Sequence, residues 1–203
     1  MKIICIGRNY SEHAKEMNAP VSEKPVFFMK PDTAILRNGY DFYFPDFTSN
    51  LHYECELVYR IDKVGKNIAE KFAHKYYTAV TLGIDFTARD LQEQCKEKGL
   101  PWEIAKAWEH SAPISTDFID VSSLNTADIS FELTKNGQVV QQGKSSEMIF
   151  NINQIIAYIS TFMTLKKGDL IYTGTPAGVG PVKIGDVLEG FLEGKKMFTF
   201  HVK

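Results

Sequence analysis

The chain has 203 residues, of which 44% are hydrophobic and 24% charged, and its formal net charge is −2 at pH 7. This length fits one domain, so we expect residues 1–203 to fold as a single unit. The near-neutral charge excludes the basic footprint of a nucleic-acid-binding protein, and no apolar run approaches the ~20 residues that cross a bilayer.

The cysteines are spaced too widely for a disulfide framework or a paired-cysteine metal site; they are Cys5, Cys55 and Cys95. We expect them to be buried free thiols in a cytoplasmic protein. Small acidic metabolites remain compatible partners, because a site can be locally positive while the whole chain is nearly neutral.

The first segment predicts a strand and then a short helix. Residues 2–7 are predicted to form a strand, and Asn9 with Glu12 fits a capping box. The helix would cover residues 12–17 and end around Asn18 and Pro20.

Residues 26–61 predict more strands. Short aromatic-rich runs fill residues 26–47, where Asn38-Gly39 is typical of a hairpin turn. Residues 52–61 then alternate strictly, with one side carrying Tyr53, Cys55, Leu57, Tyr59 and Ile61, and the other carrying Glu54, Glu56 and Arg60. This alternation predicts a half-buried strand.

The remaining segments complete a strand-dominated chain. A β-rich run over residues 76–84 ends at Asp85, and a charged helix then opens at Thr87 and ends at Gly99. Residues 129–143 predict a hairpin around a second Asn-Gly turn, and isoleucines at helical spacing predict a helix over residues 151–163. Regular strand–helix alternation is missing, so we expect a mixed or antiparallel α+β fold.

Glu54, Glu56 and Asp85 form a candidate metal site. The two glutamates leave the same face of a strand, where they repel one another if that face is dry. A cation between them removes this penalty, and all-oxygen ligation favours Mg²⁺, Mn²⁺ or Ca²⁺ over zinc. Spacing alone nevertheless favours a solvated strand face, and a lone Asp before a helix is more often a cap.

Three further residues could take part in chemistry. His13 and Glu16 share one helix face, and a carboxylate beside an imidazole suits a general base, although a surface helix carries such a pair by chance as well. Lys106 lies between apolar residues and two tryptophans, where it could bind an anion or extend to solvent.

Six segments together resemble the fumarylacetoacetate hydrolase family, nearer its small single-domain members than the two-domain fumarylacetoacetase. They follow the family's order across nearly the whole chain: IGRNYSEHAKEMN (6–18), PVFFMKP (25–31), HYECEL (52–57), GIDFTARDLQ (83–92), GLPWEIAK (99–106) and GDLIYTGTPAGVG (168–180). The resemblance implies a mixed β-roll or β-sandwich core of the fumarylacetoacetase C-terminal type and a homodimer.

The resemblance also implies roles for particular residues. Glu54, Glu56 and Asp85 match the family's ligands for Mg²⁺ or Mn²⁺, with Ca²⁺ as a substitute. His13 and Glu16 match a water-activating pair on a lid, and Lys106 matches a contact to the substrate oxyanion. Four more positions match substrate-binding motifs: Arg8, Arg89, Gln92 and Thr175.

One segment departs from the family pattern. Close relatives commonly continue after the lysine with Gly or Ser, then Phe-Asp, whereas this chain has Ala107-Trp108-Glu109-His110. We therefore expect the cavity wall near Lys106 to differ and to influence the choice of acyl group.

The implied chemistry is formation of an enolate beside a carboxylate. The metal would hold a small 2-keto or diketo acid, and the enzyme would cleave a C–C bond of acylpyruvates or decarboxylate oxaloacetate. Keto–enol tautomerisation of oxaloacetate and isomerisation or decarboxylation of hydroxymuconate-type compounds remain alternatives. A non-catalytic binding protein on the same scaffold is a remote one.

Overall fold

The strands form three sheets within residues 1–16 and 22–203, the part of the chain that the computed structural model describes. The largest sheet has the strand order β2 (Val26–Lys30), β1 (Ile3–Gly7), β12 (Leu170–Tyr172), β5 (Cys55–Ile61), β6 (Tyr77–Ile84), β8 (Ala112–Ile114) and β3 (Ile35–Arg37), and β9 (Ile119–Asp120) pairs with β6. The second has the order β11 (Gln138–Lys144), β10 (Ser130–Lys135), β14 (Val187–Leu192) and β15 (Lys195–His201). The smallest joins β13 (Gly180–Pro181), β4 (Leu51–Tyr53) and β7 (Thr87–Ala88).

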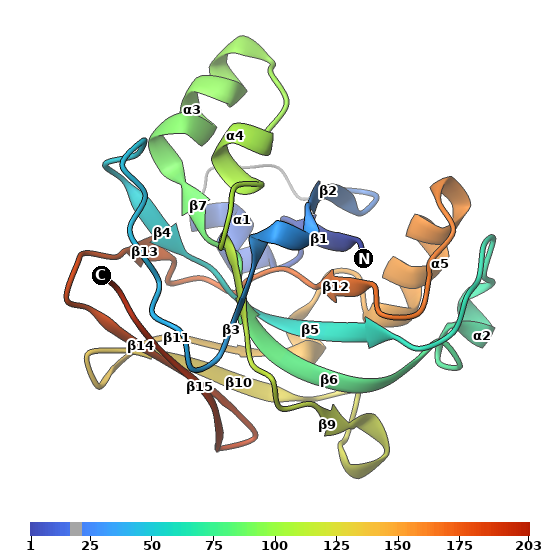
Figure 1. The fold of residues 1–203 in the computed structure, drawn as a ribbon. Helices are drawn as coiled ribbons and strands as arrows, with labels where there is room; N and C mark the ends of the chain where they lie inside the picture. Colours follow the sequence, from blue (N-terminus) through green and yellow to red (C-terminus); the bar gives the residue numbers. More distant parts are fainter. Residues whose placement is uncertain (17–21) are drawn as a thin grey trace.

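The helices are short and lie around these sheets. They are α1 (Ser11–Glu16), α2 (Glu70–Ala73), α3 (Arg89–Lys98), α4 (Glu103–Lys106) and α5 (Ile152–Phe162). In Figure 1, β5 and β6 curve across the middle of the molecule, the β10–β11–β14–β15 sheet lies below them, and α3 and α4 stand above. Pairs β1–β12 and β3–β8 are parallel and the other pairs are antiparallel, so the predicted mixed, strand-dominated α+β architecture is confirmed.

The predicted alternation along β5 holds, but both of its faces are buried. Cys55, Leu57, Tyr59 and Ile61 join the main hydrophobic core, whereas Val58 packs on the opposite face. Glu54 and Glu56 share that opposite face and are only 6% and 1% exposed. The prediction of a half-buried strand, and with it a solvated glutamate face, is therefore wrong.

Two local predictions near the N-terminus are wrong. The predicted capping box of Asn9 and Glu12 is the first. The Asn9 side chain donates to the carbonyl oxygens of Phe150 and Thr173, at 2.9 and 2.7 Å, and so joins distant segments instead of capping α1. The Asn38-Gly39 turn forms, but β3 pairs in parallel with β8 and not with the chain after the turn. The predicted helix end around Met17, Asn18 and Pro20 lies outside the described residues.

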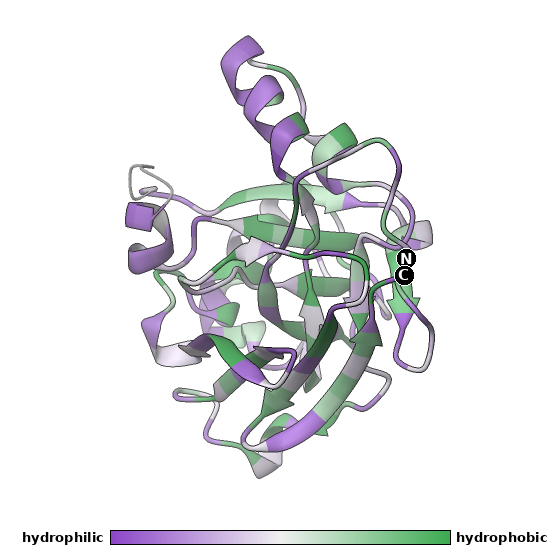
Figure 2. Cartoon of the chain, turned by 90° about the vertical axis from the view of Figure 1, so that its left-hand side faces the viewer, coloured by the Kyte–Doolittle hydropathy of each residue, from purple (hydrophilic) through white to green (hydrophobic). Residues whose placement is uncertain are grey.

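Other local signals are confirmed. Helix α3 ends at Gly99, which adopts the left-handed φ of 63° that glycine tolerates best. β10 and β11 form the hairpin predicted around Asn136-Gly137, and α5 forms within the predicted range of residues 151–163. The Asn151 side chain caps α5, a feature that was not predicted. All three cysteines are free and buried. In Figure 2, α3 is a largely hydrophilic helix that projects beyond the green strands. No helix among the described residues is long and apolar enough to cross a membrane.

Candidate metal centre and active site

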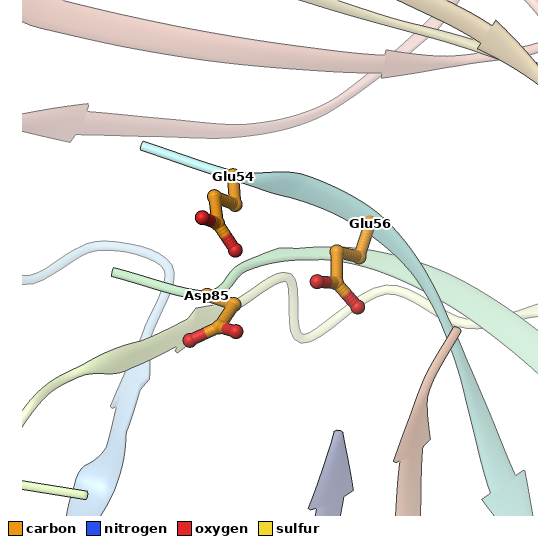
Figure 3. A group of neighbouring side chains, drawn as sticks. All are labelled: Glu54, Glu56 and Asp85. Atoms are coloured by element: carbon orange, nitrogen blue, oxygen red, sulfur yellow. The ribbon is translucent and has the colours of Figure 1, made fainter. Parts of the chain in front are cut away.

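The three predicted carboxylates meet where β5 and β6 pair. Glu54 lies just before β5, Glu56 lies within it, and Asp85 directly follows β6. Cys55 pairs with Ile84, and the Asp85 amide donates to the Glu54 carbonyl at 2.8 Å. Carboxylate oxygens of the three residues lie within 4.8 Å of one another, and Figure 3 shows the side chains turned toward a common space. Long-range strand pairing therefore builds the triad.

Cationic side chains hold two of these carboxylates. The Lys106 ammonium donates to Glu54 Oε2 at 2.8 Å and to Asp85 Oδ2 at 2.7 Å, and Arg89 donates to Glu54 Oε1 at 2.7 Å. Burial opposes ionisation of Glu54, but Lys106 and Arg89 hold its pKa well below the usual range. Burial likewise opposes the charge of Lys106, yet Asp85 and Glu54 raise its pKa. Both pKa shifts favour the charged forms of Glu54 and Lys106 at neutral pH.

Glu56 has no such cation within the part of the chain that the structure describes. Its Oε2 accepts a backbone hydrogen bond from Gly174 N at 2.7 Å. Burial, and then the negative charges of Asp85 and Glu54, raise the pKa of Glu56 well above its usual value. A divalent cation would remove both penalties, and three buried oxygen donors suit a hard ion. Among the described residues, this is the one group of acidic, His or Cys side chains close enough to share a metal.

Lys30 is a member of the site that sequence reasoning missed. Its fully buried ammonium lies 2.7 Å from Asp85 Oδ1. The contact is close but is not aligned as a hydrogen bond, so Asp85 Oδ1 is compensated by charge alone. Lys30 also donates to the carbonyls of Phe86, Ser111 and Lys106 and so ties the chain around the triad together. A signal existed, since a lysine ending the apolar strand VFFMK needs a buried partner.

The predicted His13–Glu16 pair forms on α1. His13 Nδ1 lies 3.2 Å from Glu16 Oε2, and His13 lines the cavity that contains the triad. Both oxygens of Glu16 also lie 3.2 Å from the backbone amide of Gly178, which donates to them. The carboxylate is therefore held from two directions and can orient the imidazole.

The four residues that match substrate-binding motifs also line this cavity: Arg8, Arg89, Gln92 and Thr175. Arg89 donates to Gln92 Oε1 at 2.7 Å, so the two side chains support one another. Thr175 Oγ1 donates to the Cys55 carbonyl and accepts from Gln141, each at 2.8 Å. Buried Gln141 is a second residue that sequence reasoning missed, because nothing local to the β11 strand marks it as a bridge to Thr175.

An aromatic wall closes the cavity, but it is not the predicted one. Phe28 and Trp102 line the cavity with ring centroids 6.0 Å apart. Trp108 instead packs against Phe42 and Phe47, and among the described residues neither it nor its two successors line the cavity. The expectation that the Trp108-Glu109-His110 segment forms the cavity wall is therefore wrong, because the aromatic residues of the 42–47 segment draw Trp108 away.

Comparison with known proteins agrees with this geometry. The family model "Fumarylacetoacetate (FAA) hydrolase C-terminal" matches residues 2–202. The mouse protein named oxaloacetate tautomerase FAHD1, mitochondrial (Mus musculus), is 44% identical over 99% of this chain and 91% of its own length.

Solved structures share the fold at somewhat lower sequence identity. A fumarylpyruvate hydrolase from Pseudomonas aeruginosa, in complex with Mn²⁺ and pyruvate, is 36% identical with a TM-score of 0.93 and covers 100% of this chain and 89% of its own. A 2-hydroxyhepta-2,4-diene-1,7-dioate isomerase from Mycobacterium marinum is 35% identical with a TM-score of 0.85, covering 99% and 73%. With the fold and the carboxylate triad in place, this chain belongs to the fumarylacetoacetate hydrolase family of enzymes.

Proposed function

We propose that this chain is a divalent-metal-dependent enzyme that interconverts the keto and enol forms of oxaloacetate. The observation that carries the proposal is the buried cluster in which Lys106 joins Glu54 and Asp85. A fixed ammonium beside a cation site suits a substrate that develops negative charge next to a carboxylate. The name of the mouse relative, 44% identical over 99% of this chain, supports oxaloacetate as the substrate.

Different residues of the site would bind the metal, stabilise the oxyanion and orient the substrate. Glu54, Glu56 and Asp85 would hold Mg²⁺ or Mn²⁺, with Ca²⁺ as a substitute, and the bound ion would supply Lewis-acid stabilisation and a template for the 2-oxo acid. Lys106 places a positive charge beside the developing oxyanion. Arg8, Arg89, Gln92 and Thr175 orient the substrate from the cavity wall.

His13 moves the proton. Glu16 fixes the orientation of its imidazole through the 3.2 Å contact at Nδ1, which leaves Nε2 for the substrate. In tautomerisation, His13 takes a proton from C3, which lies between the keto group and the distal carboxylate, and the keto oxygen at C2 receives a proton to complete the enol. Since both forms of oxaloacetate have the same composition, this step needs neither water nor an oxidant.

The same pair favours a second activity, hydrolysis of acylpyruvates. If His13 takes its proton from water, the resulting hydroxide can attack the distal carbonyl, so that a C–O bond forms and the C–C bond breaks. The acyl group leaves as a carboxylic acid, and the other fragment leaves as the enolate of pyruvate, which takes the proton back from His13 to give pyruvate. The name of the Pseudomonas aeruginosa structure, a fumarylpyruvate hydrolase, supports this activity. Decarboxylation of oxaloacetate could accompany either reaction, because it passes through the same type of carbanion.

The family resemblance supports a homodimer, and we include one in the proposal. A native molecular mass of about twice the 23.0 kDa chain in light scattering would agree with it. Cytoplasmic location stays a prediction from the sequence, and the mouse relative is named as mitochondrial.

The decisive experiment compares reactions in one Mg²⁺-loaded preparation. Loss of the enol absorbance of oxaloacetate reports tautomerisation, and pyruvate release from acetylpyruvate and from oxaloacetate reports hydrolysis and decarboxylation. Glu16→Ala should slow the proton-transfer reaction that His13 serves by about 10²- to 10⁴-fold. Glu12→Ala is the matched control, because Glu12 is exposed on the same helix and pairs with Lys15.

The two variants separate the outcomes. Unchanged rates in Glu16→Ala would remove the His13–Glu16 pair from the mechanism. Equal losses in both variants would indicate damage to α1 instead of lost base catalysis. Absence of all three reactions in the wild-type protein, with Mg²⁺ and with Mn²⁺, would contradict the proposed function.

A further inference from the structure

Lys96 is a third residue of α3 that lines the cavity of the triad. Arg89, Gln92 and Lys96 are spaced three and four residues apart, so they lie along one face of the helix. All three line the cavity of the triad. Arg89 and Gln92 are buried whereas Lys96 is exposed, which places Lys96 at the outer end of the line.

Aromatic rings support this lysine as they support Lys106. The Lys106 ammonium lies 5.1 Å from the centroid of the Phe28 ring, and the Lys96 ammonium lies 6.0 Å from that of Trp102. Phe28 and Trp102 pack on one another. The same aromatic pair therefore contacts the Lys106 ammonium beside the carboxylates and the Lys96 ammonium at the outer part of the cavity. Ring faces stabilise such cations and limit their hydration.

Arg8 and Lys96, here called the outer cations, have no acidic partner among the residues that the structure describes. Lys106, Arg89 and Lys30 form ion pairs with Glu54 or Asp85. Arg8 and Lys96 form none with any carboxylate of the described residues. Residues 17–21, which are not described, include no acidic side chain.

The outer cations also affect one another. Burial, and then the positive charges of Arg89 and Arg8, lower the pKa of Lys96. Arg8 has a left-handed φ of 59°, a conformation that costs free energy and is typical of functional sites. Two neighbouring cations without acids, one of them on a strained backbone, form a site for an anionic group.

We infer that Lys96, together with Arg8, binds the second carboxylate of a dianionic 2-oxo acid, while the triad and Lys106 receive its 2-oxo carboxylate end. The inference rests on the proposed function and deepens it by assigning the residues that bind the second carboxylate of the substrate. Monoanionic 2-oxo acids would leave the outer cations without a counter-charge. Lys96 is thereby a specificity-determining residue that acts through substrate charge and not through proton transfer.

A matched pair of ligands tests the inference. 2-Oxoglutarate and 2-oxopentanoate have the same number of carbons and the same 2-oxo acid end, but only the first carries a second carboxylate. Calorimetric titration of each into the Mg²⁺-loaded protein measures the preference directly. We expect 2-oxoglutarate to bind at least about fivefold more tightly, the size of a partly exposed ion pair.

Variants assign the preference to Lys96. Lys96→Met should reduce the preference for 2-oxoglutarate over 2-oxopentanoate to within about twofold. Lys96→Arg should keep this preference, because the positive charge remains. Lys98→Met is the control, since Lys98 is exposed on the same helix and does not line the cavity. In oxaloacetate turnover, Lys96→Met should raise KM about fivefold with a smaller change in kcat.

Each outcome decides between the proposals. Equal binding of the two ligands by the wild-type protein, or an undiminished preference in Lys96→Met, overturns the role of Lys96 and leaves the 2-oxo acid site intact. Failure of both ligands to bind in the presence of Mg²⁺ overturns the proposed function and this inference together.

Discussion

Replacing Lys30 tests whether the triad depends on its buried cations. Its side chain is 0% exposed and its ammonium lies 2.7 Å from Asp85 Oδ1, which is itself buried. In Lys30→Met, one oxygen of Asp85 faces an apolar group where a charge had been. Breaking a buried ion pair from one side costs about 3–5 kcal/mol when the remaining charge has no other partner. Asp85 Oδ2 keeps its 2.7 Å contact with Lys106, so we expect the lower end of that range, about 3 kcal/mol.

The backbone contacts of Lys30 add less. Ser111 O also accepts from Phe86 N, and Lys106 O also accepts from Ser111 Oγ, so those carbonyls keep partners. The Phe86 carbonyl loses its 3.2 Å hydrogen bond, which adds about 1 kcal/mol. We therefore expect the free energy of unfolding to fall by roughly 4 kcal/mol in metal-free protein.

Urea denaturation in the presence of a chelator measures this loss, and repetition with Mg²⁺ tests its cause. Part of the loss should return with Mg²⁺, since a bound cation compensates Asp85 in place of the ammonium. Lys2→Met is the matched control: Lys2 also pairs with an aspartate, Asp169, but its side chain is 25% exposed and its loss should cost about 1 kcal/mol or less. A loss in Lys30→Met no larger than in the control would refute the reasoning.

Two further predictions concern the triad and the core. In the wild-type protein, Mg²⁺ plus oxalate at 100 times Kd should stabilise the fold by about 2.7 kcal/mol, and Glu56→Gln should abolish most of this thermal stabilisation. The metal-free variant should be no less stable than the metal-free wild-type protein, because a repelled buried charge is gone. Equal stabilisation of the two proteins by Mg²⁺ plus oxalate would contradict this prediction. Gly190→Ala should cost about 1–3 kcal/mol in urea denaturation, since its Cβ would lie 2.4 Å from Phe198 and 2.7 Å from Leu82. Adding Phe198→Leu should recover part of that loss, and a cost below about 0.5 kcal/mol would show that the ring moves aside freely.

Local sequence signals determined much of the fold. The Asn136-Gly137 hairpin, the α5 helix with its Asn151 cap and the glycine that ends α3 all rest on contacts within a few residues. Such features depend on turn chemistry and side-chain periodicity, which the sequence displays directly. The Asn38-Gly39 turn shows the limit of this reasoning, because the turn formed while the strand partner came from far along the chain.

Only the tertiary structure decided how the site is charged. Spacing put Glu54 and Glu56 on one face of a strand, yet it could not say whether water or protein covers that face. The answer lay in Lys30, Arg89 and Lys106, which are 24 to 52 positions away from Glu54 in sequence and reach it or Asp85 through folding. Periodicity specifies which side chains share a face, whereas burial, partners and pKa depend on the elements that pack against it. The candidate metal ligands, Arg89 and Lys106 could therefore be named from the sequence, whereas the ion pairs that hold the carboxylates emerged only from the tertiary structure.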